Sequence, residues 1–290
     1  MDLLGLAFIG VFLAALGVGR LVPRASPFFA RAMLPIVVVL VFTISMWGGN
    51  SIRTVRGAAS LLAYSAAYAV STMFLGYSMG LGLGGVGRGR GVSGAGPPRL
   101  GLVFVLDLAV GWAVGSFVEL PRPESIITGE LYVLAGVVGL GLGGEVGRGA
   151  LGSVGVEGVK AVGLAVAGSL LAGLVLSPIL RVPLRASLAV ALGFGWYTFD
   201  GPAVAAYAGP YLGVMAFLAN FLREQLTFAV VPLLPGNPAA LISMGGATTM
   251  DDTLPLYAAV LGREYSIPAM VNGLILTLIV PVVIPLILAA

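Results

Sequence analysis

The chain has 290 residues, of which 59% are hydrophobic and only 9% are charged, and its mean hydropathy of +1.07 is far above that of a soluble domain. The net charge of +3 comes from basic residues that stand singly or in pairs, so it does not indicate nucleic acid as a partner. Cysteine and histidine are both absent, which excludes disulfides, thiolate metal sites and histidine proton carriers and leaves any proton to carboxylates, phenols or water.

Apolar runs recur along the whole chain, and each is long enough to cover a hydrocarbon core about 30 Å thick. The sequence therefore predicts an all-α integral membrane protein with about 8–10 transmembrane segments in a single domain over residues 1–290. The run that begins at Leu3 lacks a basic flank, so we interpret it as a first span and not as a removed signal peptide. Helices are expected at residues 3–21, 28–48, 57–79, 100–118, 130–146, 158–180, 184–198, 210–234, 239–260 and 266–289.

Basic residues in the short loops predict the orientation of these spans. Eight of them follow the first, third and fifth predicted spans, whereas five lie in the intervening loops. Because cytoplasmic loops are the more basic ones, we expect a multi-pass protein of the cell membrane whose N-terminus lies outside.

The chain divides near residue 150 into two halves of about five apolar segments each, although the halves share no clear sequence identity. An odd number of spans would insert a second copy upside down, as in many secondary transporters, so we expect inverted half-repeats at 1–150 and 151–290. Glycine-interrupted stretches occur at 43–51 and 193–202, which makes Asn50 and Asp200 candidate counterparts.

The string GLGLGG occurs twice, at 80–85 and 139–144, and matches the GxGxxG pattern of dinucleotide-binding loops. That fingerprint needs a preceding strand and a βαβ unit, whereas each copy here ends a predicted membrane span. We therefore interpret both copies as glycine-rich helix ends, with residues 80–98 forming a flexible loop.

Residues 193–255 contain Asp200, Arg223, Glu224, Asp251 and Asp252 among residues that are otherwise almost wholly apolar. An ionised side chain near a bilayer centre costs about 2.5–3.5 kcal/mol even on the insertion scale, so several together need a common purpose. We therefore predict an ion and substrate pathway. The alternative is that all five lie in head-group loops, although Glu224 stands midway along an apolar run that is too long for a loop.

Glycine and proline interrupt the predicted helices of the same region at 193–202, 235–238 and 245–252. Non-helical backbone at membrane depth persists only where it is buried in protein or lines a cavity, so we expect two discontinuous or re-entrant helices. Their half-helix N-termini would offer N–H donors to an anion. The residues from Gly245 to Thr249 are the candidate anion nest.

Four motifs resemble the LysO-type lysine exporters of prokaryotes: GFGWYTFDG, AFLANFLREQL, GGATTMDDTLP and REYSIPAMVNGLILTLIVPVVIPL. The resemblance is specific over residues 190–290 and is limited to general hydropathy before them. It implies export of L-lysine and toxic analogues, driven by an ion gradient, with essential intramembrane acids. The buried glutamate of the family falls on Glu224, and its aspartate before the TLP run falls on Asp251.

The chain also departs from the family pattern. The family usually has serine at the positions of Thr198 and Asp200 and histidine at that of Asn272, and an acid that many members carry near the end of the second span is Asn50 here. Asp200 is the candidate replacement for that acid. Asp252 stands where the family has an uncharged residue.

Lysine carries one carboxylate and two ammonium groups, so the resemblance implies an anion nest at one end of the site and the acids Glu224 and Asp251 at the other. Moving a net positive charge out against an inside-negative potential costs about 2.3 kcal/mol per 100 mV, so export needs coupling, and a proton entering on either acid would cancel the charge movement. Adjacent helix residues point about 100° apart, so we expect Arg223 to pair with a neighbouring carboxylate while Glu224 faces the cavity. An ordinary buried ion pair is the alternative.

The expected ligands are H⁺ or Na⁺ as coupling ion, L-lysine or a related basic amino acid, and membrane lipid. No catalytic residue, metal site or cofactor is expected, and a homodimer is left open. The candidate substrate- and ion-binding residues are Glu224, Asp251, Asp200, Asn220, Thr248, Thr249, Gly245, Gly246, Asn50, Arg223, Asp252, Trp196 and Tyr197.

Three other functions are weighed against export. A broken-helix sodium/proton antiporter would keep the architecture and use Asp251 and Asp252 as its ion site. An intramembrane aspartyl protease would need Asp200 and Asp251 as facing carboxylates that share a proton, but the GxGD element expected of it is absent, so we expect no enzyme. A scaffold or channel is the third alternative.

Overall fold

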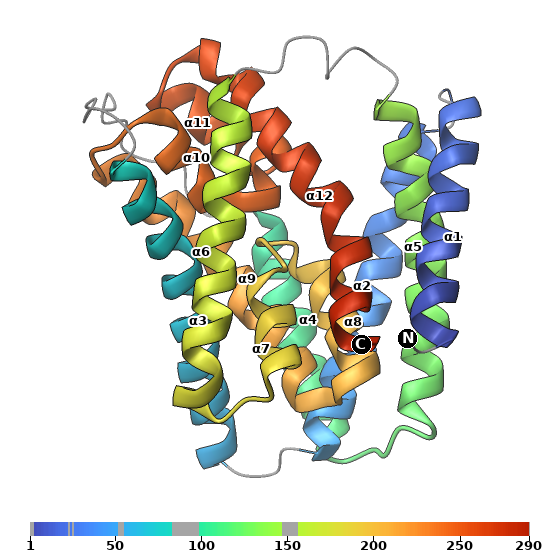
Figure 1. Cartoon of the computed structure of the whole chain (residues 1–290). Helices are drawn as coiled ribbons and strands as arrows, with labels where there is room; N and C mark the ends of the chain where they lie inside the picture. The colour runs from blue at the N-terminus through green and yellow to red at the C-terminus, as the bar shows by residue number, and fades with distance from the viewer. Residues whose placement is uncertain are drawn as a thin grey trace.

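The computed structural model describes residues 3–22, 24, 26–51, 55–82, 99–146 and 156–289, and the regular secondary structure within them is entirely helical. This confirms the predicted all-α class (Figure 1). The α-helices are α1 (Leu3–Leu21), α2 (Ser26–Ser51), α3 (Val55–Leu81), α4 (Arg99–Gly115), α5 (Pro123–Val146), α6 (Val156–Leu180), α7 (Leu184–Ala191), α8 (Tyr197–Ala208), α9 (Pro210–Val230), α10 (Pro238–Gly245), α11 (Leu254–Val260) and α12 (Ser266–Ala289). Short 3-10 helices are η2 (Val231–Leu233), η3 (Gly246–Met250) and η4 (Arg263–Tyr265).

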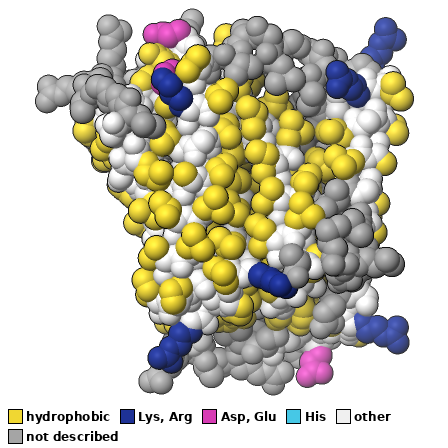
Figure 2. Space-filling view, viewed as in Figure 1, with side chains coloured by type: hydrophobic (Ala, Val, Ile, Leu, Met, Phe, Trp, Pro, Cys, Tyr) yellow, Lys and Arg dark blue, Asp and Glu magenta, His cyan; other side chains and the backbone are white. Residues whose placement is uncertain are grey.

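Helix length and composition fit an integral membrane protein. Within the described ranges, four helical segments are long and apolar enough to cross a membrane, namely Gly57–Leu81, Val156–Leu180, Pro210–Leu233 and Ser266–Ala289. Shorter apolar stretches lie in α1, α2, α4 and α5. Figure 2 shows hydrophobic side chains over the middle of one face and charged side chains mostly near its upper and lower ends. The total of 8–10 spans and the inverted half-repeats stay predictions.

Small residues bring these helices close together. A Cβ added at Gly139 of α5 would lie 2.7 Å from the Phe12 carbonyl oxygen of α1, and one at Gly111 of α4 would lie 2.8 Å from the Phe42 carbonyl oxygen of α2. Apolar side chains gain little by meeting one another in lipid, so close backbone approach supplies the packing. Gly139 belongs to the second GLGLGG string, which lies inside α5 and not in a dinucleotide-binding loop. Most of the expected loop at 80–98 falls outside the described residues.

Two broken-helix hairpins occupy the later half, and Figure 1 shows them at opposite ends of the bundle. In the α7–α8 hairpin the helices are joined at residues 192–196, where Phe194 (φ 51°) and Gly195 (φ 89°) take left-handed backbone conformations. In the α10–α11 hairpin the break begins at Gly246, whose φ is 62°. The two expected helix breaks are therefore present, and their re-entry relative to a bilayer stays a prediction.

Two details of the sequence prediction are wrong. Residues 43–51 do not interrupt a span, because α2 runs unbroken from Ser26 to Ser51. Gly201 and Pro202 do not end a helix but lie inside α8, which was not expected as a separate element. Glycine and proline are tolerated within membrane helices because surrounding groups satisfy the freed backbone, so neither residue type alone marks a break.

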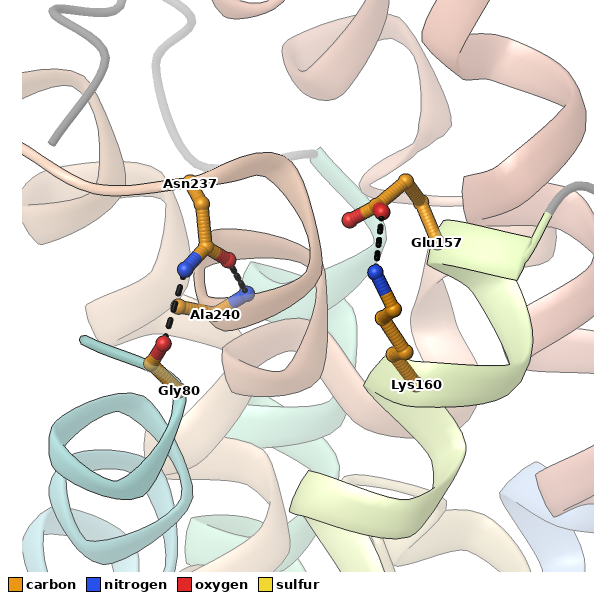
Figure 3. Close-up of polar contacts among 5 residues, drawn as sticks. All are labelled: Gly80, Glu157, Lys160, Asn237 and Ala240. Carbon is orange, nitrogen blue, oxygen red and sulfur yellow. Dashed lines mark hydrogen bonds and ion pairs between the residues drawn. The ribbon is translucent and has the colours of Figure 1, made fainter. Parts of the chain in front are cut away.

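The start of α10 is fixed by Asn237 (Figure 3). Its Oδ1 accepts a hydrogen bond of 2.8 Å from the Ala240 amide, which caps α10, and its Nδ2 donates one of 2.7 Å to the Gly80 carbonyl at the end of α3. The same view shows Lys160 and Glu157 of α6 joined at 2.8 Å at the protein surface. Asn237 thereby ties the α10–α11 hairpin to α3, one of the long helices.

Candidate functional site

The tips of the two hairpins touch through their backbones. The Ala247 amide at the α10–α11 tip donates a hydrogen bond of 2.8 Å to the Phe194 carbonyl at the α7–α8 tip. A Cβ added at Gly246 would collide with that carbonyl oxygen, and one added at Gly195 would lie 3.4 Å from the Gly245 carbonyl oxygen. The glycines therefore allow two stretches of non-helical backbone to satisfy each other inside the protein.

One buried face of α9 carries the polar residues nearest these tips. Asn220, Arg223 and Glu224 are 3%, 1% and 1% exposed, and their spacing of three and four residues places them on neighbouring positions of one helix face. Asp200 on α8 is 0% exposed. The alternative that all five charged residues lie in head-group loops is therefore wrong for Asp200, Arg223 and Glu224, which are buried on helices.

Asp200 is held by Asn220. The Asn220 Nδ2 donates to Asp200 Oδ2 at 2.7 Å, while the Asn220 Oδ1 accepts from the Gly195 amide at 2.7 Å. The second carboxyl oxygen, Asp200 Oδ1, is buried and has no hydrogen-bond partner among the described residues. The first turn of α8 favours a negative charge by about 0.3–1 kcal/mol. Burying an unpaired ion costs several kcal/mol, so the helix terminus alone does not offset it.

Arg223 does not pair with a carboxylate within the described part of the chain, contrary to expectation. Its Nε donates to the Met244 carbonyl at 3.0 Å, one terminal nitrogen donates to the Ser243 carbonyl at 2.9 Å, and the other lies 3.4 Å from Ser169 Oγ. These carbonyls belong to the C-terminal turn of α10, where the helix dipole favours a positive charge. Arg223 therefore fastens α9 to the α10–α11 hairpin.

Glu224 lies in a group of three carboxylates. Gln225 Nε2 donates to its Oε1 at 3.3 Å, and the Tyr197 hydroxyl is within hydrogen-bonding reach of the same carboxyl group. Oε2 is buried and without a hydrogen-bond partner among the described residues. Asp251 and Asp252 are exposed and close enough for their charges to act on Glu224. Two exposed acids therefore lie within electrostatic range of one buried acid.

Aromatic rings form one side of this region. The Tyr197 ring meets Phe217 and Phe221 edge-on, at centroid distances of 5.2 and 5.3 Å. The Trp196 ring stacks on Phe199 at 5.0 Å. These contacts fix Tyr197 in place and leave its hydroxyl directed toward Glu224.

The candidate nest at 245–249 is largely engaged within the protein. Thr248 Oγ1 donates to the Gly245 carbonyl at 2.9 Å, and Thr249 Oγ1 donates to the Ala269 carbonyl of α12 at 2.7 Å. Asn272 of α12 donates to the Gly246 carbonyl at 2.8 Å. The two threonine hydroxyls therefore shape the tip, and the Ala247 amide is already bound to Phe194.

Asn50 does not join this group. Its Nδ2 donates to the carbonyls of Gly115 and Val118, the latter at 2.8 Å, and its Oδ1 accepts from the Leu120 amide at 3.1 Å. Asn50 thus holds the end of α2 to the turn after α4. It stands at the end of a continuous helix, whereas Asp200 stands beside a break, so the structure gives no basis for treating the two as counterparts.

Two partly buried acids are not among the candidates that the sequence indicated. Glu130 of α5 accepts a hydrogen bond of 3.0 Å from Thr43 of α2, and its Oε2 is buried without a partner among the described residues. Asp107 of α4 has a similarly unpartnered Oδ2. Both acids stand within or at the edge of an expected span, so the criterion that selected Glu224 would also have selected them.

The fold and this site define a class: a multi-pass, all-α membrane protein whose interior joins broken helices to buried acids. The family model described as "Lysine exporter LysO" matches residues 105–288, which is more than half of the chain, so the protein belongs to this family. The resemblance of the motifs in residues 190–290 is thereby confirmed.

Two relatives agree with this assignment. The "Lysine exporter LysO" of Escherichia coli (strain K12) is 37% identical over 120 residues, which cover 41% of this chain and 40% of that protein. The "Putative lysine exporter" of Haemophilus influenzae (strain ATCC 51907 / DSM 11121 / KW20 / Rd) is 32% identical over 114 residues, which cover 39% of this chain and 58% of that protein. The matched part is therefore less than two thirds of either relative.

Proposed function

We propose that this protein is a secondary active exporter of L-lysine and related basic amino acids that exchanges its substrate for protons. Membership of the family and the name of the Escherichia coli relative support the substrate. The observation that carries the proposal is the juxtaposition of buried Glu224 with exposed Asp251 and Asp252.

The three carboxylates suit a substrate with a mobile ammonium group. Like charges within electrostatic range oppose one another, so a cation that enters among them relieves repulsion as well as supplying a partner for the unpartnered Glu224 Oε2. Asp251 and Asp252 would receive the cation from water, and Glu224 would hold it within the protein.

The carboxylate of the substrate would lie at the hairpin tips. The Ala247 amide is the donor there, and in this structure it is bonded to Phe194. A substrate carboxylate would compete with the Phe194 carbonyl for that amide, since both are oxygen acceptors. Binding of this end of lysine would therefore accompany separation of the two tips.

Exchange with protons follows from the charge balance. Moving one positive charge outward against an inside-negative potential costs about 2.3 kcal/mol per 100 mV. A proton that binds a carboxylate as lysine leaves it returns one charge inward, and the two cations exclude each other because they use the same oxygens. We propose Glu224 and Asp251 as the acids where this exclusion occurs, in a cell-membrane protein whose N-terminus lies outside.

Transport in proteoliposomes tests the proposal. A proton gradient should drive radiolabelled lysine accumulation by the wild type, and Glu224→Gln should lower both lysine binding and accumulation by about 100-fold, the equivalent of a lost charge-assisted contact of roughly 3 kcal/mol. Glu157→Gln, at the surface in its pair with Lys160, is the matched control and should transport normally. Unchanged lysine binding and flux in Glu224→Gln would remove Glu224 from the mechanism.

A sodium/proton antiporter is the second candidate, because the adjacent and exposed pair Asp251 and Asp252 offers carboxylate oxygens to a small cation. The same vesicles separate the two functions. Proton flux that depends on lysine and not on sodium supports export of lysine, and the reverse dependence supports the antiporter.

A further inference from the structure

We propose that Asp200 is a proton-binding site separate from the Glu224 group, and that the proton it carries holds the two hairpin tips together. The inference deepens the proposed function and rests on it for the role of the tips in transport. Its own observation is the set of contacts that runs from the Asp200 carboxyl to the Ala247 amide.

Asp200 has the surroundings of a neutral carboxyl group. It is fully buried, it receives a single side-chain hydrogen bond, from Asn220, and its Oδ1 is unpartnered within the described ranges. A neutral acid tolerates such surroundings far better than an ion does. A proton on this carboxyl group therefore replaces the cation that an ionised Asp200 would require.

The charged groups around α8 do not supply that cation. Within the described part, none of the titratable side chains on the packed helices is hydrogen-bonded or ion-paired to Asp200, and the guanidinium of Arg223 is engaged by Met244, Ser243 and Ser169. The titratable side chains described on these helices are Arg31 on α2, Glu130 and Tyr132 on α5, Arg185 on α7, and Tyr211, Arg223 and Glu224 on α9; α12 carries none.

Asn220 connects the Asp200 carboxyl group, and therefore its protonation state, to the α7–α8 tip. Its Nδ2 donates to Asp200 at 2.7 Å and to the Val190 carbonyl at 3.1 Å, and its Oδ1 accepts from the Gly195 amide at 2.7 Å. Gly193 also packs directly on the carboxyl group, because a Cβ added there would lie 2.6 Å from Asp200 Cγ. The turn at 192–196 is thus packed on the Asp200 carboxyl group at Gly193 and hydrogen-bonded, through Asn220, at Gly195.

Loss of the proton would disturb this fit. An ionised Asp200 needs water or a cation at its unpartnered Oδ1. In this proposal, the turn that packs on the carboxyl group at Gly193 moves away as either one enters. Phe194 lies between Gly193 and Gly195, so its carbonyl would leave the Ala247 amide. Protonation of Asp200 therefore keeps the tips in contact, and deprotonation separates them.

The proton site and the acid group are adjacent along α9. Asn220, which holds Asp200, and Glu224 are four residues apart and occupy one helix face a single turn apart. Separation of the tips also frees the Ala247 amide. Release of a proton from Asp200 and uptake of substrate beside Glu224 are then coupled through the same separation of the tips.

The absence of cysteine makes a direct test practicable. Ala247→Cys places a thiol at the buried tip, and Phe117→Cys places a reference thiol at a position that is 90% exposed. The rate of maleimide labelling at Ala247→Cys, divided by the rate at Phe117→Cys at each pH, reports opening of the tips without the pH dependence of thiol chemistry. The measurement needs neither lysine nor a gradient, so its outcome is independent of lysine transport.

With Asp200 intact, the normalised rate should rise with pH by up to about tenfold per unit while the proton is released, as expected for one linked proton. Asp200→Asn, which has the shape of the neutral acid, should give a low rate at every pH, and Glu157→Gln should behave like the parent. Asp200→Ser, neutral and smaller, should also remove the pH dependence and serves where Asp200→Asn folds poorly. The proposal is overturned if the normalised labelling rate of the parent does not change with pH. It is also overturned if the rate in both Asp200 variants rises with pH as much as it does in the parent.

Discussion

The Ala247 amide donates a hydrogen bond of 2.8 Å to the Phe194 carbonyl, and this bond joins the tips of hairpins that belong to different parts of the chain. Each tip is a helix break whose free backbone groups lipid cannot satisfy, so the two breaks satisfy each other. Asp200 and Asn220 hold the α7–α8 tip through hydrogen bonds that reach the Gly195 amide. Arg223 and Asn272 hold the α10–α11 tip through hydrogen bonds to the Ser243 and Gly246 carbonyls.

Gly246→Ala should open this contact. Gly246 has a φ of 62°, and an added Cβ would meet the Phe194 carbonyl oxygen. We expect about 1–2 kcal/mol of backbone strain and about 1–3 kcal/mol of overpacking, with loss of lysine flux. Thermal unfolding in detergent and proteoliposome transport measure the two effects.

Gly209 provides a matched control for that substitution. Its φ is 86°, but nothing lies within 4 Å of an added Cβ, so Gly209→Ala carries the strain without the collision. Transport by Gly209→Ala should stay close to that of the wild type. Equal losses of stability and flux in both variants would show that backbone strain, and not loss of the contact between the tips, causes the effect of Gly246→Ala.

Arg223→Lys should destabilise the protein without abolishing substrate binding. A lysine ammonium cannot reproduce the fork that reaches the Met244 and Ser243 carbonyls, and hydrogen bonds to charged groups contribute about 1.5–3 kcal/mol each. We expect a loss of about 2–3 kcal/mol in unfolding free energy and an unchanged lysine affinity.

The exposed Arg185 is the control for this change, and Arg185→Lys should leave stability unaltered. Denaturation and isothermal titration separate the two properties. A normally stable Arg223→Lys protein that no longer binds lysine would place Arg223 in the substrate site instead.

The breaks and the buried charges could be expected from the sequence because lipid penalises both. Glycine-rich stretches mark the breaks at 192–196 and 246–253, and the ionic cost marks Glu224 and Asp200. The partners could not be expected, because they are set by packing between distant segments. Arg223 is bonded to carbonyls of α10 and not to a carboxylate, and the glycines at 43–51 serve close helix packing within an unbroken α2.

Gly139→Leu should disrupt the packing of α1 on α5. An added Cβ at Gly139 would lie 2.7 Å from the Phe12 carbonyl oxygen, whereas nothing lies within 4 Å of one added at Gly136, one turn earlier on the same helix. Both changes improve helix propensity by about 1 kcal/mol, so their difference reports the collision alone. Thermal unfolding should show Gly139→Leu less stable than Gly136→Leu by about 2 kcal/mol or more, and equal stability would contradict the α1–α5 packing.

Glu130→Gln should be tolerated or stabilising. Thr43 Oγ1 lies 2.9 Å from the Val39 carbonyl and 3.0 Å from Glu130 Oε1, but a hydroxyl group has only one proton to donate. A side chain at position 130 that itself donates to Thr43 would satisfy both contacts, and the glutamine amide does so without a buried charge.

We expect Glu130→Gln to raise the unfolding free energy by about 1 kcal/mol, whereas Glu130→Ala should lower it by about 1 kcal/mol because the hydrogen bond between α2 and α5 is lost while Thr43 keeps the Val39 carbonyl as acceptor. Thermal unfolding in detergent checks both values, and lysine flux should be retained in Glu130→Gln. A stable Glu130→Gln protein without flux would instead make Glu130 a second functional acid, between α2 and α5, in addition to those near α9.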